Sequence, residues 1–168
     1  ALTLLIAGLS WMSHEITNLA PVLKSYWLIV HVAIVTASYG FLAIGSLLGL
    51  TNLILTILRN QKNKERVSST IKELVYIIEI ALIIGLFLLT IGSFLGGVWA
   101  NESWGRYWGW DPKETWAMVT ILVYSFIVHM HKLPGLKGHF QVSTAALIGF
   151  LSVIMTYFGV NYYMSGLH

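Results

Sequence analysis

Cysteine is absent from the 168 residues of the chain, and charged residues are scarce. The missing thiols exclude disulfide bonds, thiolate metal sites and cysteine nucleophiles from this chain. Charged residues make up 10% of the sequence, whereas a typical soluble domain has about 25%. Hydrophobic residues reach 57% and form runs longer than the about 20 residues that cross a bilayer as a helix. The sequence therefore predicts an integral membrane protein.

The apolar runs predict an all-α, polytopic membrane bundle with about four full transmembrane helices. The expected spans are residues 27–58, 74–97, 114–131 and 140–163. The opening "ALTLLIAGLS" is too short to span, and we interpret it as the end of a partial N-terminal helix. No internal repeat or linker interrupts the sequence, so residues 1–168 are expected to form one domain of a larger membrane protein.

Lysine and arginine residues predict the orientation of the bundle. Segment 59–72 holds five of them and segment 131–139 holds two, whereas Lys24, Arg106 and Lys113 lie on the opposite side. Because basic loops remain in the cytoplasm, the segment between the second and third spans is expected to face outward. The same distribution explains the net charge of +3 without a nucleic-acid partner, and no aromatic and basic RNA signature is present.

The outward segment is unusually rich in tryptophan. Residues 104–116 read "WGRYWGWDPKETW" and contain four of the seven tryptophans of the chain. Its second half has a local explanation: Asp111 is a helix N-cap, Pro112 suits the first helical position, and Glu114 completes a capping box. The sequence therefore predicts that a helix begins directly after Asp111.

The first half of this segment is typical of a platform for a large planar ligand. Trp104, Tyr107, Trp108 and Trp110 are interleaved with Gly105 and Gly109, whose missing Cβ atoms allow flat rings a close approach. The alternative is an aromatic belt at the membrane interface, which is the better interpretation of Trp99 or Trp116 taken alone.

Histidines near the same side strengthen the hypothesis of a ligand site. His31 lies one turn into the first span, and His168 ends the chain after "GVNYYMSGL"; His14 is also expected to face outward. A single histidine near a helix end is usually an interfacial polar residue. Two on the side of a tryptophan platform suggest the axial ligands of a haem iron, because neutral imidazole is a standard iron ligand.

Other ionisable residues occupy the inner side. His129 lies within the third span, where an ionisable residue is costly and often marks a pathway or a cofactor. His131 is interpreted as interfacial, His139 as a loop residue, and Glu79 as a snorkelling or paired carboxylate.

"WGRYWGWDPKETWA" resembles the WWD signature of haem-handling proteins in cytochrome c maturation, and "WDPKETWA" looks most like the CcsA/ResC family of System II cytochrome c synthases. "SYWLIVHVAIVTASYG", "VYSFIVHMH" and "GVNYYMSGLH" are similar to the histidine segments of that family. The resemblance covers the chain from about residue 22 onward, which corresponds to the C-terminal core of CcsA or of a CcsB–CcsA fusion.

This resemblance implies a role for each candidate residue. His31 and His168 would ligate the iron of haem b on the outer side, and His129 would ligate a second haem within the membrane. The WWD segment, about 99–116, would bind the ring through Trp99, Trp104, Gly105, Tyr107, Trp108, Trp110, Asp111 and Trp116. Arg106 and Lys113 would either pair with the haem propionates or remain interfacial cations.

The resemblance further implies a holocytochrome c synthase that adds the two CxxCH thiols of apocytochrome c to the haem vinyl groups. No catalytic residue is expected beyond those that position haem. The expected partners are a CcsB/ResB-type portion, apocytochrome c, thiol-reducing proteins and membrane lipid, in a bacterial inner membrane or a thylakoid. Two alternatives remain: a haem transporter or chaperone that only presents haem, and a structural subunit whose tryptophans form a belt.

Overall fold

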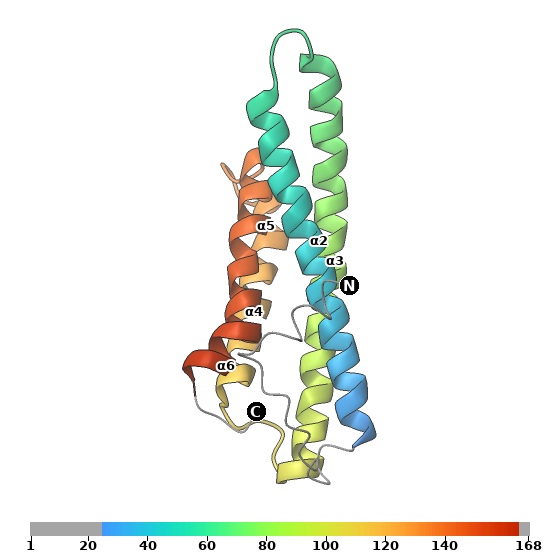
Figure 1. Cartoon of the computed structure of the whole chain (residues 1–168), viewed down its shortest axis with the longest axis vertical. Helices are drawn as coiled ribbons and strands as arrows, with labels where there is room; N and C mark the ends of the chain where they lie inside the picture. Colours follow the sequence, from blue (N-terminus) through green and yellow to red (C-terminus); the bar gives the residue numbers. More distant parts are fainter. Residues whose placement is uncertain (1–24, 165–168) are drawn as a thin grey trace, which may run out of the picture.

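The computed structural model describes residues 25–164, and this part of the chain is helical without any strand. The elements in chain order are α2 (Tyr26–Leu58), α3 (Lys64–Trp104), α4 (Pro112–His129), the 3₁₀ turn η2 (Met130–Lys132), α5 (His139–Ile154), the π-helical turn η3 (Met155–Gly159) and α6 (Val160–Tyr163) (Figure 1). The prediction of an all-α membrane bundle is confirmed. The partial N-terminal helix, His14 and Lys24 lie outside the described residues.

Three helical stretches of the described region are long and apolar enough to cross a membrane: Tyr26–Leu58, Lys64–Trp104 and His139–Tyr163. The fourth expected span, α4, has 18 residues and begins with a proline, a lysine and a glutamate. Its crossing of the membrane stays a prediction.

Two predicted boundaries between helix and loop were wrong, because α3 is much longer than its apolar run. It has 41 residues and begins at Lys64, so the basic connection contains only residues 59–63. At its other end α3 continues to Trp104, so Trp99 and Trp104 are helical and the loop that follows is residues 105–111. We call residues 105–111 the aromatic loop and the end of the bundle that carries it the tryptophan end.

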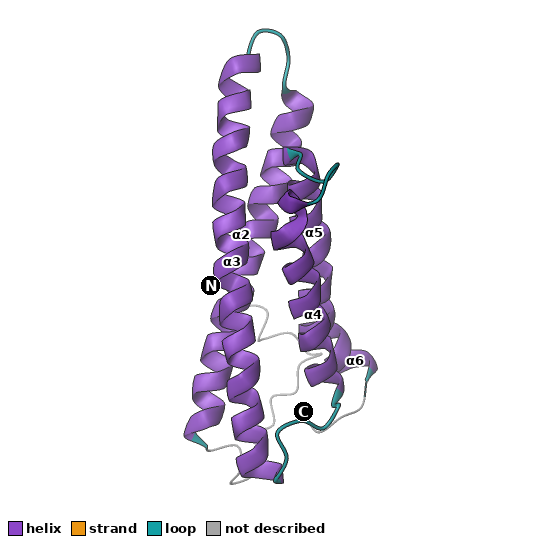
Figure 2. Cartoon of the chain, turned by 180° about the vertical axis from the view of Figure 1, so that it is seen from behind, coloured by secondary structure: helices purple, strands orange, loops and turns teal. Residues whose placement is uncertain are grey.

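Helices α2 and α3 form an antiparallel hairpin in a single register (Figure 2). Four glycines each face a larger side chain of the other helix: Gly45 faces Leu82, Gly85 faces Leu42, Gly92 faces Val35, and Gly96 faces His31. A Cβ atom on any of these glycines would lie 2.6–2.7 Å from its partner. Small residues therefore permit the close approach of the two helix axes, as in other membrane helix pairs.

Helices α4 and α5 pack against this hairpin and complete the core. Leu42, Ile78, Leu82, Leu89 and Tyr124 are the largest apolar side chains with almost no exposure. The α2–α5 contact also contains a buried polar pair, because Asn52 Nδ2 donates to Ser143 Oγ over 2.8 Å. Such a hydrogen bond between helices stabilises a membrane bundle by about 0.6–2 kcal/mol.

The last helical stretch is interrupted by the π turn η3. Thr156 in this turn is buried, and its hydroxyl lies 2.7 Å from the carbonyl of Ser152 and 3.0 Å from the hydroxyl of Thr120 in α4. Asn161 Nδ2 donates to the carbonyl of Tyr157. Side-chain donors thus satisfy carbonyl groups around the turn, and a contact with α4 fixes its position.

Candidate functional site

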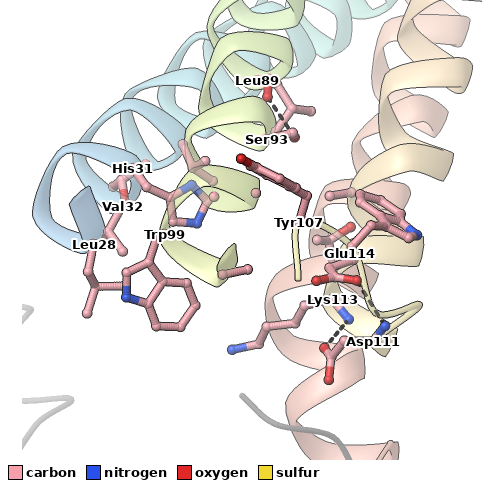
Figure 3. Close-up of a pocket in the computed structure, with 18 of the residues that line it drawn as sticks. Leu28, His31, Val32, Leu89, Ser93, Trp99, Tyr107, Asp111, Lys113 and Glu114 are labelled. Carbon is pink, nitrogen blue, oxygen red and sulfur yellow. Dashed lines mark hydrogen bonds between the residues drawn. The ribbon is translucent and has the colours of Figure 1, made fainter. Parts of the chain in front are cut away.

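A cavity of about 430 Å³ opens at the tryptophan end, within the size range of small-molecule sites. Its walls come from α2, α3, the aromatic loop, the first turns of α4, the π turn and α6 (Figure 3). On α3 its wall runs from Leu89 to Trp104, which is about 22 Å along the helix axis. The cavity is therefore elongated along the bundle and extends from the aromatic loop into the apolar part of the molecule.

His31 lies in the cavity wall in an orientation that leaves one ring nitrogen free. Its Nδ1 lies 2.7 Å from the carbonyl oxygen of Gly92. Because a carbonyl can only accept, this bond places the imidazole proton on Nδ1 and leaves the lone pair on Nε2. Iron- and zinc-bound histidines are held in the same way, through a hydrogen bond from the second nitrogen. Gly96 provides the space for the ring, since a Cβ atom there would lie 2.7 Å from His31 Cε1.

Most of the predicted ring-binding residues meet at this cavity. Trp99, Trp104, Tyr107, Trp108 and Asp111 all line it. Figure 3 shows Trp99 and His31 on the α2–α3 side, with Asp111, Lys113 and Glu114 at the start of α4. Tyr107 approaches α3 closely, because Gly97 has no Cβ atom and its ideal Cβ position lies 3.1 Å from the carbonyl of Tyr107.

Three of the predicted residues are not among those that line the cavity. Gly105 ends α3 with a left-handed φ of 70°, a conformation that favours glycine. Trp110 is 69% exposed, and its ring meets the edge of Trp108. Trp116 takes part in a hydrogen bond through its backbone: its carbonyl oxygen accepts from the hydroxyl of Thr120 over 2.9 Å. The positions of these residues thus give no support to ring binding by Trp110 or Trp116.

The start of α4 has the predicted capping box. The side chain of Asp111 accepts from the backbone N–H of Lys113 over 3.1 Å, and Glu114 accepts from the N–H of Asp111, also over 3.1 Å. Both carboxylates are therefore engaged with the backbone. Arg106 and Lys113 bring two cationic side chains to the same cavity. Burial lowers the pKa of Lys113, and the neighbouring carboxylate of Asp111 opposes this shift.

Comparison with known proteins identifies the family of this chain. The whole chain, residues 1–168, matches the family described as "Cytochrome C assembly protein". The chain belongs to the cytochrome c assembly family.

Three curated relatives illustrate the similarity within the cytochrome c assembly family. Protein NrfI of Wolinella succinogenes is 53% identical over 162 residues, which cover 96% of this chain and 18% of that protein. The cytochrome c biogenesis protein CcsA of Prochlorococcus marinus strain MIT 9301 is 40% identical over 176 residues, covering 90% of this chain and 56% of the relative. CcsA of Mesostigma viride is 39% identical, with 94% and 58% covered. This chain therefore spans less than two thirds of each of these relatives.

The sequence did not lead us to the polar residues that line the inner part of the cavity at the tryptophan end. They are Thr36, Tyr39, Ser93, Thr156, Tyr157 and Asn161. The rings of Tyr39 and Tyr157 meet edge to face with centroids 6.4 Å apart. A cluster of hydroxyl and amide groups inside apolar spans was visible in the sequence. The π turn that brings Tyr157 and Asn161 to the cavity has no sequence signature that we could have used.

The predicted ligand of the second haem lies elsewhere. His129 is at the far end of α4, about 25 Å along the axis from Pro112, and its side chain is exposed. Its Nδ1 lies 2.7 Å from the carbonyl of Ser125, so Nε2 is free here too. Next to it, His131 and Glu79 line a separate cavity of about 40 Å³. His168 lies outside the described residues.

Proposed function

We propose that the cavity at the tryptophan end holds haem for cytochrome c maturation, with His31 as one axial ligand of the iron. The observation that carries this proposal is the orientation of His31, whose Nδ1–H is held by Gly92 while Nε2 stays free beside an indole-lined cavity. His168 is proposed as the second ligand. The ring would lie against Trp99, Trp104, Tyr107 and Trp108, with Arg106 and Lys113 available to its two propionates.

The residues of the cavity fit such a ligand chemically. Haem is a flat apolar ring with an iron that takes imidazole nitrogen and with carboxylates at one edge. The cavity offers an imidazole nitrogen, large aromatic rings and two cations, in a wall that is mostly apolar. Glycines at 96 and 97 leave room for His31 and for the aromatic loop, respectively. The donor set therefore suits haem better than a hydrophilic substrate.

The proposed reaction is that of a holocytochrome c synthase. Each thiol of a CxxCH motif in apocytochrome c adds across one haem vinyl group, forming one C–S and one C–H bond with no leaving group. The cavity has no cysteine or serine–histidine pair that would act as a nucleophile, so we propose that the chain contributes position. Fixed geometry of this kind can lower a barrier by about 7–11 kcal/mol.

The same hypothesis extends to the orientation of the protein in the membrane and to a second haem site. The tryptophan end would face the periplasm of a bacterial inner membrane, or the equivalent side of a thylakoid membrane. His129, exposed at the opposite end of α4, would ligate a second haem together with a histidine of a CcsB/ResB-type portion. Its exposure supports a ligand supplied from outside the described bundle.

The test is an absorption spectrum of the full-length protein purified from membranes and reduced with dithionite. We expect His31→Ala to lose at least about 90% of its haem and to recover it with added imidazole, because imidazole can replace the missing ligand. His139→Ala is the matched control, since this histidine is exposed at the other end of the bundle. Unchanged haem content in His31→Ala would overturn the ligand assignment.

A second assay separates a synthase from a haem transporter or chaperone, which would use the same cavity. A co-expressed apocytochrome c is denatured, and covalently attached haem is measured. Attachment that requires His31 and no additional ligating protein supports the synthase. Haem-loaded protein without attachment would favour the transporter or chaperone.

A further inference from the structure

The aromatic loop contains a residue in an unfavourable backbone conformation. Trp110 has φ of 56° and is the only non-glycine residue with positive φ in the described region 25–164. Such a conformation costs about 1–3 kcal/mol for a residue with a Cβ atom, and it persists only where neighbouring contacts enforce it. The loop must therefore contain a contact that holds Trp110 in place.

Glu114 supplies that contact. A single carboxylate oxygen, Oε2, accepts from the backbone N–H of Gly109 over 2.8 Å and from that of Asp111 over 3.1 Å. These two N–H groups flank Trp110 on both sides. The bond to Asp111 belongs to the capping box, but the bond to Gly109 is not required for any helix cap. Glu114 thus holds both ends of the left-handed residue.

This arrangement determines which way the two neighbouring indoles face. The rings of Trp108 and Trp110 are perpendicular, with centroids 5.8 Å apart. Trp108 lines the cavity and is 38% exposed, whereas Trp110 is 69% exposed and does not line it. The left-handed turn therefore sends one ring to the cavity wall and the next one away from it.

Arg106 packs against the same turn at Gly109. Its guanidinium lies where a Cβ atom on Gly109 would be, with Cζ 2.8 Å from that position. Gly109 therefore contacts both Arg106 and Glu114, and a shift at Gly109 would disturb the cation and the neighbouring indole of Trp108 together.

We propose that Glu114 is a positioning residue of the cavity: its carboxylate enforces the left-handed turn at Trp110 and thereby keeps Trp108 against the bound ring. The second half of this statement rests on the proposed haem function, but the first half concerns the chain alone.

The test of the turn uses haem-free full-length protein. Two perpendicular indoles 5.8 Å apart should give a strong coupled signal in circular dichroism. Trp110→Phe identifies the part of the spectrum that comes from this pair. We expect Glu114→Ala to lose most of that part, whereas Glu114→Gln, which keeps an acceptor oxygen, retains at least about half.

Asp111→Ala is the matched control, because it removes the side-chain half of the capping box but leaves both backbone N–H groups that Glu114 holds. If Glu114 acted only as a cap, Glu114→Ala and Asp111→Ala would lose the same amount of the coupled signal, and the proposal would fail.

The test of positioning is haem titration of the same variants. We expect Glu114→Ala to weaken haem binding by about 10-fold, as is common when a supporting contact of a site is lost. Glu102→Ala removes a carboxylate near the end of α3 that bonds to Ser25 outside the cavity, and it should bind haem normally. A lost indole signal with normal haem binding would overturn the role in haem positioning and leave the turn intact as a finding. An unchanged indole signal would overturn the proposal that Glu114 enforces the turn at Trp110.

Discussion

The imidazole of His31 occupies the space that a side chain on Gly96 would take. A Cβ atom at residue 96 would lie 2.7 Å from Cε1 and 2.9 Å from Nδ1 of that ring. The ring is also held by the carbonyl of Gly92, one turn earlier on the same face of α3. Two glycines of α3 therefore fix both the position and the tautomer of a histidine on α2.

Gly96→Ala is expected to weaken haem binding as a mutation of His31 would, although the histidine itself is unchanged. The new methyl group must displace the ring from the Gly92 carbonyl, so haem binding should fall by about 10–100-fold. Haem content of the purified variant measures this. Gly40→Ala is the control, because nothing lies within 4 Å of its Cβ position. That variant should bind haem normally and gain about 0.5–1 kcal/mol of helix stability. Equal haem content in both variants would contradict the prediction.

Lys113 makes haem binding depend on pH if its ammonium group pairs with a propionate. Burial lowers the pKa of this amine below its ordinary value of 10.5. As the pH rises through the lowered pKa, the cation is lost and haem should bind more weakly. Lys113→Arg stays protonated throughout, so its haem affinity should change less over the same range. Titrations between pH 7 and pH 10.5 test this, and parallel curves for the two proteins would exclude Lys113 as the propionate partner.

The same shift has the opposite effect on the stability of the haem-free protein. Between the lowered pKa and 10.5, the unfolded state binds more protons at Lys113 than the folded state does. The free energy of unfolding should therefore rise with pH in this window. Thermal denaturation of the wild type and of Lys113→Met in detergent measures how stability changes with pH. The rise of stability with pH should be absent in the methionine variant.

The hydroxyl pair of Thr120 and Thr156 joins α4 to the π turn. Thr156→Val removes a buried hydroxyl that bonds within its own helix and across to Thr120, so unfolding should become easier by about 1 kcal/mol. Thr156→Ser keeps the hydroxyl and should lose less. Thr51→Val removes only an exposed bond to Leu47, and its effect should stay within about 0.5 kcal/mol. Similar losses in Thr156→Val and Thr51→Val would show that the pair contributes no special stability.

The buried pair of Asn52 and Ser143 allows a test in which a second mutation repairs the first. Ser143→Ala leaves Nδ2 of Asn52 without its acceptor, and Oδ1 of this amide already lacks a hydrogen-bond partner. We expect a loss of about 1–3 kcal/mol. Adding Asn52→Leu removes the stranded amide and should recover part of that loss. Thermal denaturation of the single and double variants decides, and additive losses would contradict the argument.

The sequence predicted features that depend on local chemistry. The capping box at Asp111 and Glu114 was correct, because all of its contacts lie within a few residues. The ends of α2 and of the final helical stretch were also predicted accurately from their apolar runs. A basic connection follows α2, and a glycine precedes α5. His31 lines the same cavity as Trp99 and Trp104, and its role as an iron ligand stays a prediction.

Features that depend on packing between helices were not predictable in the same way. Seven polar residues of α3 between Lys64 and Lys72 were predicted to be loop, yet they belong to a helix that packs on α2. The exposure of Trp110 follows from one backbone angle that the residue pattern does not encode. The π turn at 155–159 likewise depends on a hydroxyl from α4, far away in the sequence.

The register of the α2–α3 hairpin has a consequence for the connection between the two helices. In the four glycine contacts, the residue number on α2 falls by the same amount as the residue number on α3 rises, from Gly45 and Leu82 to His31 and Gly96. The alignment of the hairpin is therefore specified within the helices, and the exposed turn at 59–63 only joins them. This turn is the natural place for a protease site, an epitope tag or a split of the chain into two co-expressed pieces. A single residue inserted between Gly85 and Gly92 would instead move both glycines that hold His31 out of register with it.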